Sequence, residues 1–281
     1  MTIAVANTIA ETRDRVAAAR KGGATIGFVP TMGALHAGHA KLIETAHAEC
    51  GFVIVSIFVN PLQFAPNEDF QRYPRSLPAD LELSGSRGAD LVFAPGVEEM
   101  YPVEQLTFAE VTKVSDNLCG TFRPGHFRGV ATVVLKLLNI VQPDRAYFGE
   151  KDRQQLSVIR RMVRDLALPV SIVGVPTIRE SDGLALSSRN AYLNLAERRA
   201  APVVYRALLK MRELCGSGER DAAVVKNAAL DLIRAEPLAK VQYVELVDAE
   251  MQLVKRVDEG VYGAAAVWFG TTRLIDNIRC L

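Results

Sequence analysis

Cysteine, net charge and long apolar runs are all scarce in this sequence of 281 residues. The four cysteines lie far apart with no C-x-x-C pair, so we expect reduced thiols in a cytoplasmic protein (Cys50, Cys119, Cys215 and Cys280). The formal net charge of +1 argues against binding nucleic acid or a membrane surface. No apolar run reaches the roughly 20 residues of a membrane span, and the first residues do not resemble a signal peptide.

The first part of the chain alternates strand-like and helix-like segments up to residue 177, which predicts a Rossmann-like, doubly wound and mainly parallel sheet. Apolar residues make up 49% of the chain, which is enough to bury a sizeable core. The predicted strands are 25–29, 52–59, 89–93, 145–148 and 170–175. The predicted helices are 38–49, 78–87, 129–141 and 152–166.

The rest of the chain has a different order of elements. Two helical stretches come first and three strand-like runs follow, at 195–214, 221–234, 241–247, 263–269 and 272–278. We therefore expect an α/β domain over residues 1–177 and a smaller α+β lid domain over 178–281, whose strands are antiparallel. A two-domain layout also predicts a ligand cleft between the domains.

The segment Pro30-Thr-Met-Gly-Ala-Leu-His-Ala-Gly-His39 joins a predicted strand to a predicted helix. Such a turn presents unpaired backbone N–H groups and the positive end of a helix dipole, and Gly33 and Gly38 let a ligand approach closely. His36 and His39 are three residues apart, so they point to the same side of the first helical turn. We expect this turn to bind phosphate.

Two familiar nucleotide sites do not fit this turn. Gly33 and Gly38 have the spacing of a P-loop, but His39 stands in place of the lysine, and no G-x-G-x-x-G occurs in the sequence. Two other interpretations stay open: a glycine turn with incidental histidines, and a metal site formed by His36, His39 and His47.

Two further segments carry polar side chains suited to a co-substrate. Asn60 and Gln63 follow the strand at 52–59 and offer amide groups, although an ordinary turn would show the same residues. Arg123 lies in a glycine-containing loop and could pair with an oxyanion, although a solvated basic loop would look alike.

Two more segments are suited to the nucleotide itself. In Gly149-Glu-Lys-Asp152, Lys151 could neutralise a phosphate and Asp152 could accept a ribose hydroxyl, or the segment could simply cap a helix. Ser187, Ser188 and Arg189 could close over a triphosphate, or could form a polar interdomain loop. Together with the histidine turn, these segments predict a nucleoside triphosphate held from both domains.

Five motifs in this order and spacing resemble the pantoate–β-alanine ligase (pantothenate synthetase) family over essentially the whole chain. They are Pro30–His39, Phe58-Val-Asn-Pro-Leu-Gln-Phe64, Gly125-His-Phe-Arg-Gly-Val130, Gly149–Asp152 and Leu184-Ala-Leu-Ser-Ser-Arg-Asn190. The H-x-G-H piece alone would indicate only the nucleotidyltransferase superfamily. The resemblance implies that pantoate and β-alanine are joined with ATP through a pantoyl-adenylate, with release of AMP and pyrophosphate.

The resemblance also implies roles for residues at matching positions. His39, His36, Lys151 and Arg189 would be catalytic, with His39 the proton donor. ATP would contact Met32, Gly33, Ala34, Leu35, His36, Ala37, Gly38, His39, Gly149, Glu150, Lys151, Asp152, Ile178, Leu186, Ser187, Ser188 and Arg189. Gln63 and Gln155 would bind pantoate, with Asn60 and Arg123 as further substrate contacts. Mg²⁺ would accompany ATP, held mainly by phosphate oxygens, and the protein would be a homodimer.

Two positions depart from common variants of the family. Leu186 replaces a methionine of some members, which conserves volume, and Arg153 stands where an aromatic residue is frequent, which leaves the packing under Gln154 and Gln155 open. The alternative functions are another nucleotidyltransferase, such as a cytidylyl- or adenylyltransferase, and a non-catalytic regulator that binds a nucleotide or a metal.

Overall fold

A computed structural model describes residues 3–66 and 68–281. The chain forms two compact units. Unit 1 comprises Met1–Val111, Arg123–Glu150 and Val158–Pro176, and unit 2 comprises Thr112–Phe122, Lys151–Ser157 and Thr177–Leu281. Within the described ranges, no helix is both long and apolar enough to cross a bilayer.

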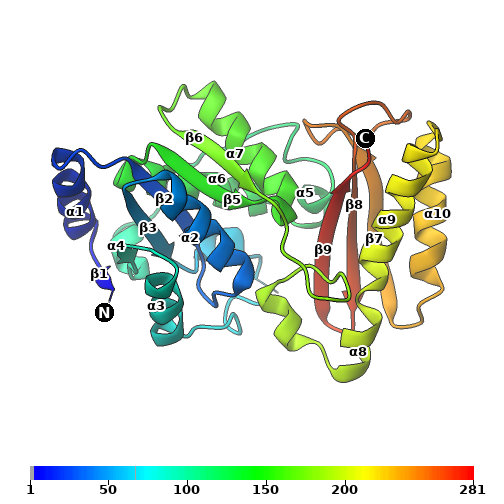
Figure 1. Cartoon of the computed structure of the whole chain (residues 1–281), viewed down its shortest axis with the longest axis horizontal. Helices are drawn as coiled ribbons and strands as arrows, with labels where there is room; N and C mark the ends of the chain where they lie inside the picture. The colour runs from blue at the N-terminus through cyan, green and yellow to red at the C-terminus, as the bar shows by residue number, and fades with distance from the viewer. Residues whose placement is uncertain (1–2, 67) are drawn as a thin grey trace. The chain divides into compact units, whose positions relative to one another are not determined.

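Unit 1 is built on a six-stranded sheet with the order β1-β4-β3-β2-β5-β6, in which every pair of neighbours is parallel (Figure 1). The strands are β1 (Ala4–Ala6), β2 (Ile26–Thr31), β3 (Phe52–Ile57), β4 (Leu91–Phe93), β5 (Arg145–Gly149) and β6 (Ser171–Val175). From β2 the chain adds β3 and β4 on one side and then crosses over to add β5 and β6 on the other, which confirms the predicted doubly wound sheet. The apolar run at 52–59 forms β3, which has neighbours on both sides, as its pattern predicted.

Helices connect these parallel strands. They are α1 (Ile9–Lys21), α2 (Ala37–Glu49), α3 (Leu77–Ser86), α4 (Val97–Met100), α6 (His126–Val141) and α7 (Arg153–Asp165), whose first residues belong to unit 2. α1 and α6 contact each other and β2, whereas α2 packs across β2, β3 and β5 and also touches α3. The buried face of α2, with Leu42, Ile43 and Ala46, fits the helical spacing read in the sequence.

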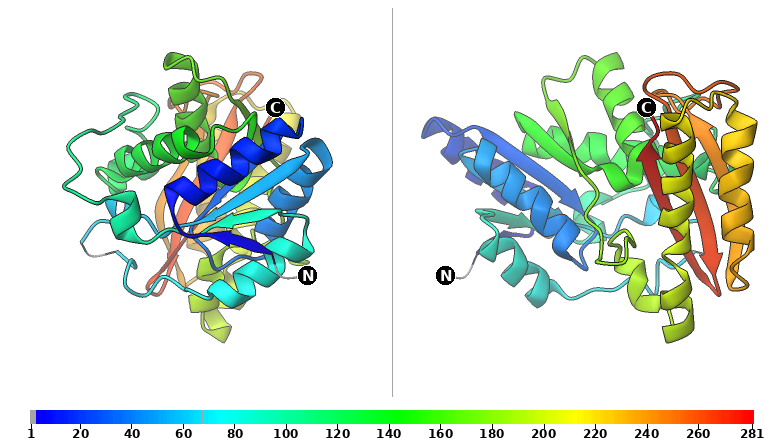
Figure 2. Two further views of the ribbon diagram at one scale, coloured as in Figure 1. Left: turned by 90° about the vertical axis from the view of Figure 1, so that its left-hand side faces the viewer. Right: turned by 45° about the vertical axis from the view of Figure 1, so that its right-hand side comes forward.

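Unit 2 contains the antiparallel sheet β7-β8-β9, as predicted for the last part of the chain. Its strands are β7 (Ala239–Val247), β8 (Tyr262–Phe269) and β9 (Thr272–Arg279), and its short helix α5 is Cys119–Phe122. α9 (Val203–Gly216) and α10 (Ala222–Arg234) lie side by side against this sheet (Figure 2). Their apolar faces form one core with β8, centred on Leu208, Val225 and Phe269.

Two features of the helices differ from the sequence prediction. The single helix expected over 195–214 is wrong, because Pro202 separates α8 (Leu195–Ala200) from α9. α1 was not predicted, although its capping box, in which Thr8 and Glu11 bond reciprocally to backbone N–H groups, is a readable start signal.

Candidate functional site

Three predicted binding turns leave the same edge of the unit 1 sheet. β2 and β3 pair in register up to Thr31 and Ile57, so both strands end together. β5 pairs with β2 on its other side and ends at Gly149. The turns at 32–36, 60–64 and 149–152 therefore begin at the carboxyl ends of three adjacent strands, where ligands bind in open parallel sheets.

The backbone N–H groups of the turn between β2 and α2 are paired with side chains of β2 and α3, so the prediction that they are unpaired is wrong. Gly33 N–H donates to Oγ1 of Thr31 at 3.2 Å, and the N–H groups of Ala34 and Leu35 donate to the carboxylate of Asp80. The helix start is closed by His36 and His39 in a reciprocal capping box. The main-chain N–H groups of residues 33–35 are therefore already paired within the protein.

The two imidazoles form the same kind of hydrogen bond, in which Nδ1 is the acceptor. Nδ1 of His36 accepts the N–H of Gly38 at 3.1 Å, and Nδ1 of His39 accepts the N–H of His36 at 3.3 Å. A ring that accepts at Nδ1 carries its proton on Nε2 when neutral. The ring centroids are 4.2 Å apart, and both residues are half-buried. The cap thus fixes both rings as Nε2–H donors.

Asn60 and Gln63 form a buried amide cluster at the end of β3, where the 3₁₀-helix η1 (Pro61–Gln63) begins. Nδ2 of Asn60 donates to Oε1 of Gln63 at 3.3 Å and to the carbonyl of Gly129 at 3.1 Å. Nε2 of Gln63 donates to Sδ of Met32 at 2.8 Å, which links this cluster to the histidine turn.

Tyr101 belongs to the same cluster and was not predicted. Its hydroxyl donates to Oδ1 of Asn60 at 2.8 Å, and burial raises the pKa of Tyr101 to about 12. The hydroxyl therefore stays protonated and fixes the orientation of the Asn60 amide. Nothing in the sequence pairs a residue of the 98–103 stretch with Asn60, so this contact follows only from the fold.

Arg123 is held in an ion pair beside Gln63. Its Nε and Nη2 each donate to Glu68 at 2.6 Å, and Nη2 lies 3.4 Å from the carbonyl of Gln63. Burial would raise the pKa of Glu68, but the bonds and charge of Arg123 hold it below its ordinary value. His126 completes the group, with Nδ1 2.8 Å from the carbonyl of Gln63. In this structure the guanidinium of Arg123 therefore supports the backbone of Gln63.

The 3₁₀-helix η2 (Glu150–Asp152), directly before α7, carries the next predicted residues. Nζ of Lys151 lies 3.9 Å from Oδ1 of Asp152, and the carbonyl of Lys151 accepts the amide of Asn277 at 2.8 Å. Arg153 lies over the ring of Tyr262, 4.0 Å from its centroid, so a cation–π contact provides the packing that was open at this position.

Gln154, which directly precedes Gln155 in the sequence, has a structural role. It is buried, accepts the N–H of Cys119 at 3.0 Å, and donates to the carbonyls of Val114 and Asn117 at 3.0 and 2.7 Å. These bonds tie the start of α7 to residues 112–122 and explain why that segment belongs to unit 2.

The remaining predicted ATP contacts form a second turn in unit 2. Leu186 N–H donates to the carbonyl of Ile178 at 3.0 Å, so these two residues lie side by side. Oγ of Ser187 accepts the N–H of Arg189 at 3.3 Å and begins the 3₁₀-helix η3 (Ser188–Tyr192). The ion pair between Arg179 and the buried Asp276, at 2.6 Å, anchors this turn to β9.

The predicted residues thus fall into two sets, one on each unit. Unit 1 carries 32–39, Asn60, Gln63, Arg123, Gly149 and Glu150, and unit 2 carries Lys151, Asp152, Gln155, Ile178 and 186–189. In the described parts of the chain, no group of three or more His, Cys, Asp or Glu side chains could hold a metal ion. The metal interpretation of His36, His39 and His47 therefore gains no support, since His47 lies in the last turn of α2.

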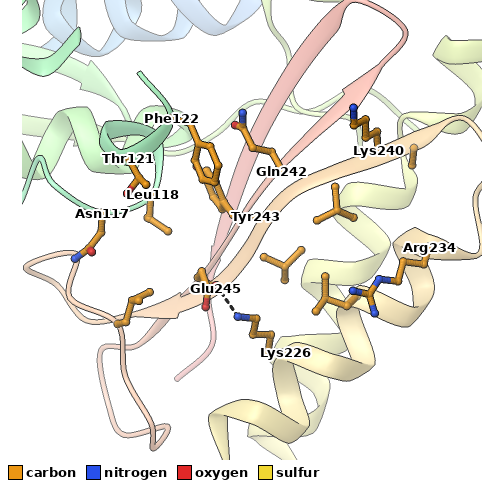
Figure 3. Close-up of a pocket in the computed structure, with 15 residues that line it drawn as sticks. Asn117, Leu118, Thr121, Phe122, Lys226, Arg234, Lys240, Gln242, Tyr243 and Glu245 are labelled. Atoms are coloured by element: carbon orange, nitrogen blue, oxygen red, sulfur yellow. Dashed lines mark hydrogen bonds and ion pairs between the residues drawn. The ribbon is translucent and has the colours of Figure 1, made fainter. Parts of the chain in front are cut away.

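A separate pocket of about 680 Å³ lies between the outer edge of β7, α10 and the segment at 117–122 (Figure 3). Phe122 stacks on Tyr243 in its wall, and Lys226 pairs with Glu245 at 2.5 Å. None of the predicted site residues lines this pocket. It is therefore distinct from the candidate site.

Comparison with known proteins gives a consistent result. Residues 4–279 match the family model described as pantoate-beta-alanine ligase. The chain is 55% identical to the pantothenate synthetase of Moorella thermoacetica, over 96% of each chain. It resembles the crystal structure of pantothenate synthetase from Thermus thermophilus, with a TM-score of 0.94, 50% identity and 99% coverage of both chains. A pantoate-beta-alanine ligase from Francisella tularensis, complexed with beta-gamma ATP and beta-alanine, has a TM-score of 0.82, 36% identity and coverage of 99% and 98%.

Proposed function

Because the chain belongs to the pantoate–β-alanine ligase family, we propose that it condenses pantoate with β-alanine through a pantoyl-adenylate, releasing pyrophosphate and then AMP. The observation that carries the proposal is the histidine turn. It holds two imidazoles, each of which accepts a backbone N–H at Nδ1, at the carboxyl edge of a parallel sheet. The ATP and β-alanine in the complex of the Francisella tularensis relative support the choice of substrates.

In the first step the pantoate carboxylate attacks the α-phosphorus of ATP, and the bond to pyrophosphate breaks. Negative charge grows on the phosphate oxygens, and the Nε2–H groups of His36 and His39 stabilise it by donating hydrogen bonds to them, while pyrophosphate leaves as an anion. Gln63, held by Asn60, binds pantoate together with Gln155. In the second step the free amine of β-alanine attacks the activated acyl carbon, and AMP leaves.

The residues of unit 2 supply positive charge and nucleotide contacts. Lys151 and Arg189 neutralise phosphate, Ser187 and Ser188 offer hydroxyl groups, and Asp152 meets the ribose. Magnesium arrives as part of the ATP complex, because magnesium sites commonly combine phosphate oxygens with few protein ligands. Closing the second domain as a lid would protect the acyl-adenylate from water.

We further propose a homodimer in the cytoplasm. Four free, buried thiols agree with a reducing compartment (Cys50, Cys119, Cys215 and Cys280). Sedimentation equilibrium tests the assembly: a mass near twice the 30.7 kDa of the chain supports a dimer, and the monomer mass contradicts it.

Pyrophosphate release tests the reaction directly. With ATP, Mg²⁺ and pantoate alone, we expect about one equivalent of pyrophosphate per site, because the adenylate stays bound. Adding β-alanine should start continuous turnover with AMP and pantothenate as products. A nucleotide-linked product instead of AMP would identify another nucleotidyltransferase, and ATP binding without turnover would identify a regulator.

A further inference from the structure

One buried carboxylate outside all the sequence motifs contacts the histidine turn. Asp80, in the first turn of α3, is 3% exposed. Its Oδ1 accepts the N–H of Leu35 at 2.7 Å, and its Oδ2 accepts the N–H of Ala34 at 3.0 Å. Leu35 directly precedes His36, so one peptide separates this contact from the first imidazole.

The backbone of the turn needs such a partner. Gly33 has φ +84° and Ala34 has φ +52°, so two consecutive residues are left-handed. For alanine this conformation costs about 1–2 kcal/mol. Successive N–H groups in a turn of this kind converge on an anion, and here the anion is Asp80. A Cβ added at Gly33 would lie 2.9 Å from Oδ2, which shows how closely the turn packs on the carboxylate.

Among the described residues, Asp80 forms no ion pair with a lysine, arginine or histidine. Its carboxylate accepts the two N–H groups of the turn. Burial raises the pKa of Asp80, and the bonds from Leu35 and Ala34 oppose that rise. Burying a carboxylate without a cation costs free energy unless hydrogen bonds compensate it. The bonds that compensate Asp80 come from the histidine turn, so its structural role is to hold that turn.

We propose that Asp80 is a positioning residue, which holds residues 33–36 in the conformation that aims Nε2 of His36 and His39 at the phosphates of ATP. The inference rests on the proposed function for its kinetic consequence. Without the carboxylate, Ala34 can leave its left-handed conformation, and the N-cap His36 shifts with it. A displacement of about 1 Å can cost about 100-fold in rate when catalytic groups must be aligned.

The test compares Asp80→Ala with Asp90→Ala, a control away from the histidine turn. Asp90 also accepts a backbone N–H, that of Val53 at 2.7 Å, but at the opposite end of the sheet, where β3 begins. Asp80 is buried and accepts two N–H groups, whereas Asp90 is exposed, so we expect Asp80→Ala to lose more thermal stability. Asp80→Ala should lower kcat of pyrophosphate release at least tenfold and raise the ATP KM, whereas Asp90→Ala should stay within twofold of the unsubstituted protein.

A spectroscopic readout separates positioning from general loosening. Long-range ¹H–¹⁵N spectra of the four histidine rings should show the Nε2–H tautomer for His36 and His39 in the unsubstituted protein. Asp80→Ala should give a tautomer mixture at these two rings only. Unchanged kinetics and unchanged ring signals in folded Asp80→Ala would overturn the proposal.

A second variant, Asp80→Asn, and the ring tautomers complete the test. If Asp80→Ala does not fold, Asp80→Asn takes its place; it preserves shape but turns an N–H₂ group toward one backbone N–H, and it should lower kcat at least fivefold. Wild-type kinetics in that variant would also overturn the proposal. If the unsubstituted protein releases no pyrophosphate with pantoate, the proposed function fails, and the ring tautomers still decide the role of Asp80.

Discussion

At the scale of single residues, the two nitrogens of His39 have different tasks that two substitutions can separate. His39→Asn keeps an acceptor at the δ position for the N–H of His36 but has no donor at the ε position. His39→Ala removes both nitrogens and, with Nδ1, the bond that caps the helix. We expect His39→Asn to lower the adenylation rate about 10²–10⁴-fold, with unfolding free energy changed by less than about 0.5 kcal/mol.

His39→Ala should lose at least as much rate as His39→Asn and, in addition, about 1 kcal/mol of unfolding free energy from the missing cap. Single-turnover pyrophosphate release and urea unfolding measure the two effects. Near-wild-type turnover in His39→Asn would remove Nε2 of His39 from the chemistry.

Gln63 provides the corresponding test of substrate assignment. Its amide is oriented by Asn60 and Met32 at the end of β3. Gln63→Ala should raise the KM for pantoate more than the KM for ATP in steady-state kinetics. Equal effects on both constants would contradict a specific place beside pantoate.

At the scale of elements, Gly129 allows α6 to pack directly on η1. A Cβ at this position would lie 2.2 Å from the carbonyl oxygen of Leu62 and 2.7 Å from Cα of Gln63. Gly129→Ala should therefore displace η1, lower the unfolding free energy by about 1–3 kcal/mol and raise the pantoate KM. Gly85→Ala in α3 is the control, since its Cβ would make an ordinary contact at 3.4 Å with Ile3. Equal stability changes in the two variants would disprove the steric argument.

The elements also show what a single sequence can and cannot reveal. Long periodic segments such as 38–49 and the apolar strand at 52–59 were predicted to within a few residues, because their burial pattern is local. Asn60 and Gln63 were found because they directly follow a strand. Asp80 and Tyr101 were not found, because their contacts with Leu35 and Asn60 depend on strand order and span about 40 residues. Pro202 is a helix breaker that the sequence shows, but the apolar periodicity on both sides of it favoured a single helix.

At the scale of the whole molecule, segments distant in sequence are built into one unit by a few buried polar groups. Gln154 bonds to residues 114, 117 and 119, and through them the start of α7 becomes part of unit 2. Gln154→Ala should therefore lower the melting temperature without a selective effect on one substrate, whereas Gln155→Ala should raise the pantoate KM with little change in melting temperature. Thermal unfolding and steady-state kinetics check both. A selective pantoate effect in Gln154→Ala would show that the two roles are not separate.

The labelling rates of the four buried thiols measure how readily each unit opens. Cys50 lies in unit 1, and Cys119, Cys215 and Cys280 lie in unit 2. Burial raises the pKa of Cys280 to about 12, which disfavours the reactive thiolate, and all four side chains are buried. Iodoacetamide should therefore label all four cysteines quickly in denaturant but each of them slowly in the native protein, at a rate set by opening of its unit.

Ligands extend this measurement to the site itself. A ligand that binds only the closed, native protein slows labelling by the factor 1 + [L]/Kd, about 100-fold at 100 times its Kd. ATP with pantoate should slow Cys50 and Cys280 together if residues of both units hold the nucleotide, as the division of the predicted contacts implies. Digestion and mass spectrometry give the rate at each cysteine. Protection of Cys50 alone would confine the nucleotide contacts to unit 1 and would remove Lys151 and Arg189 from the proposed site.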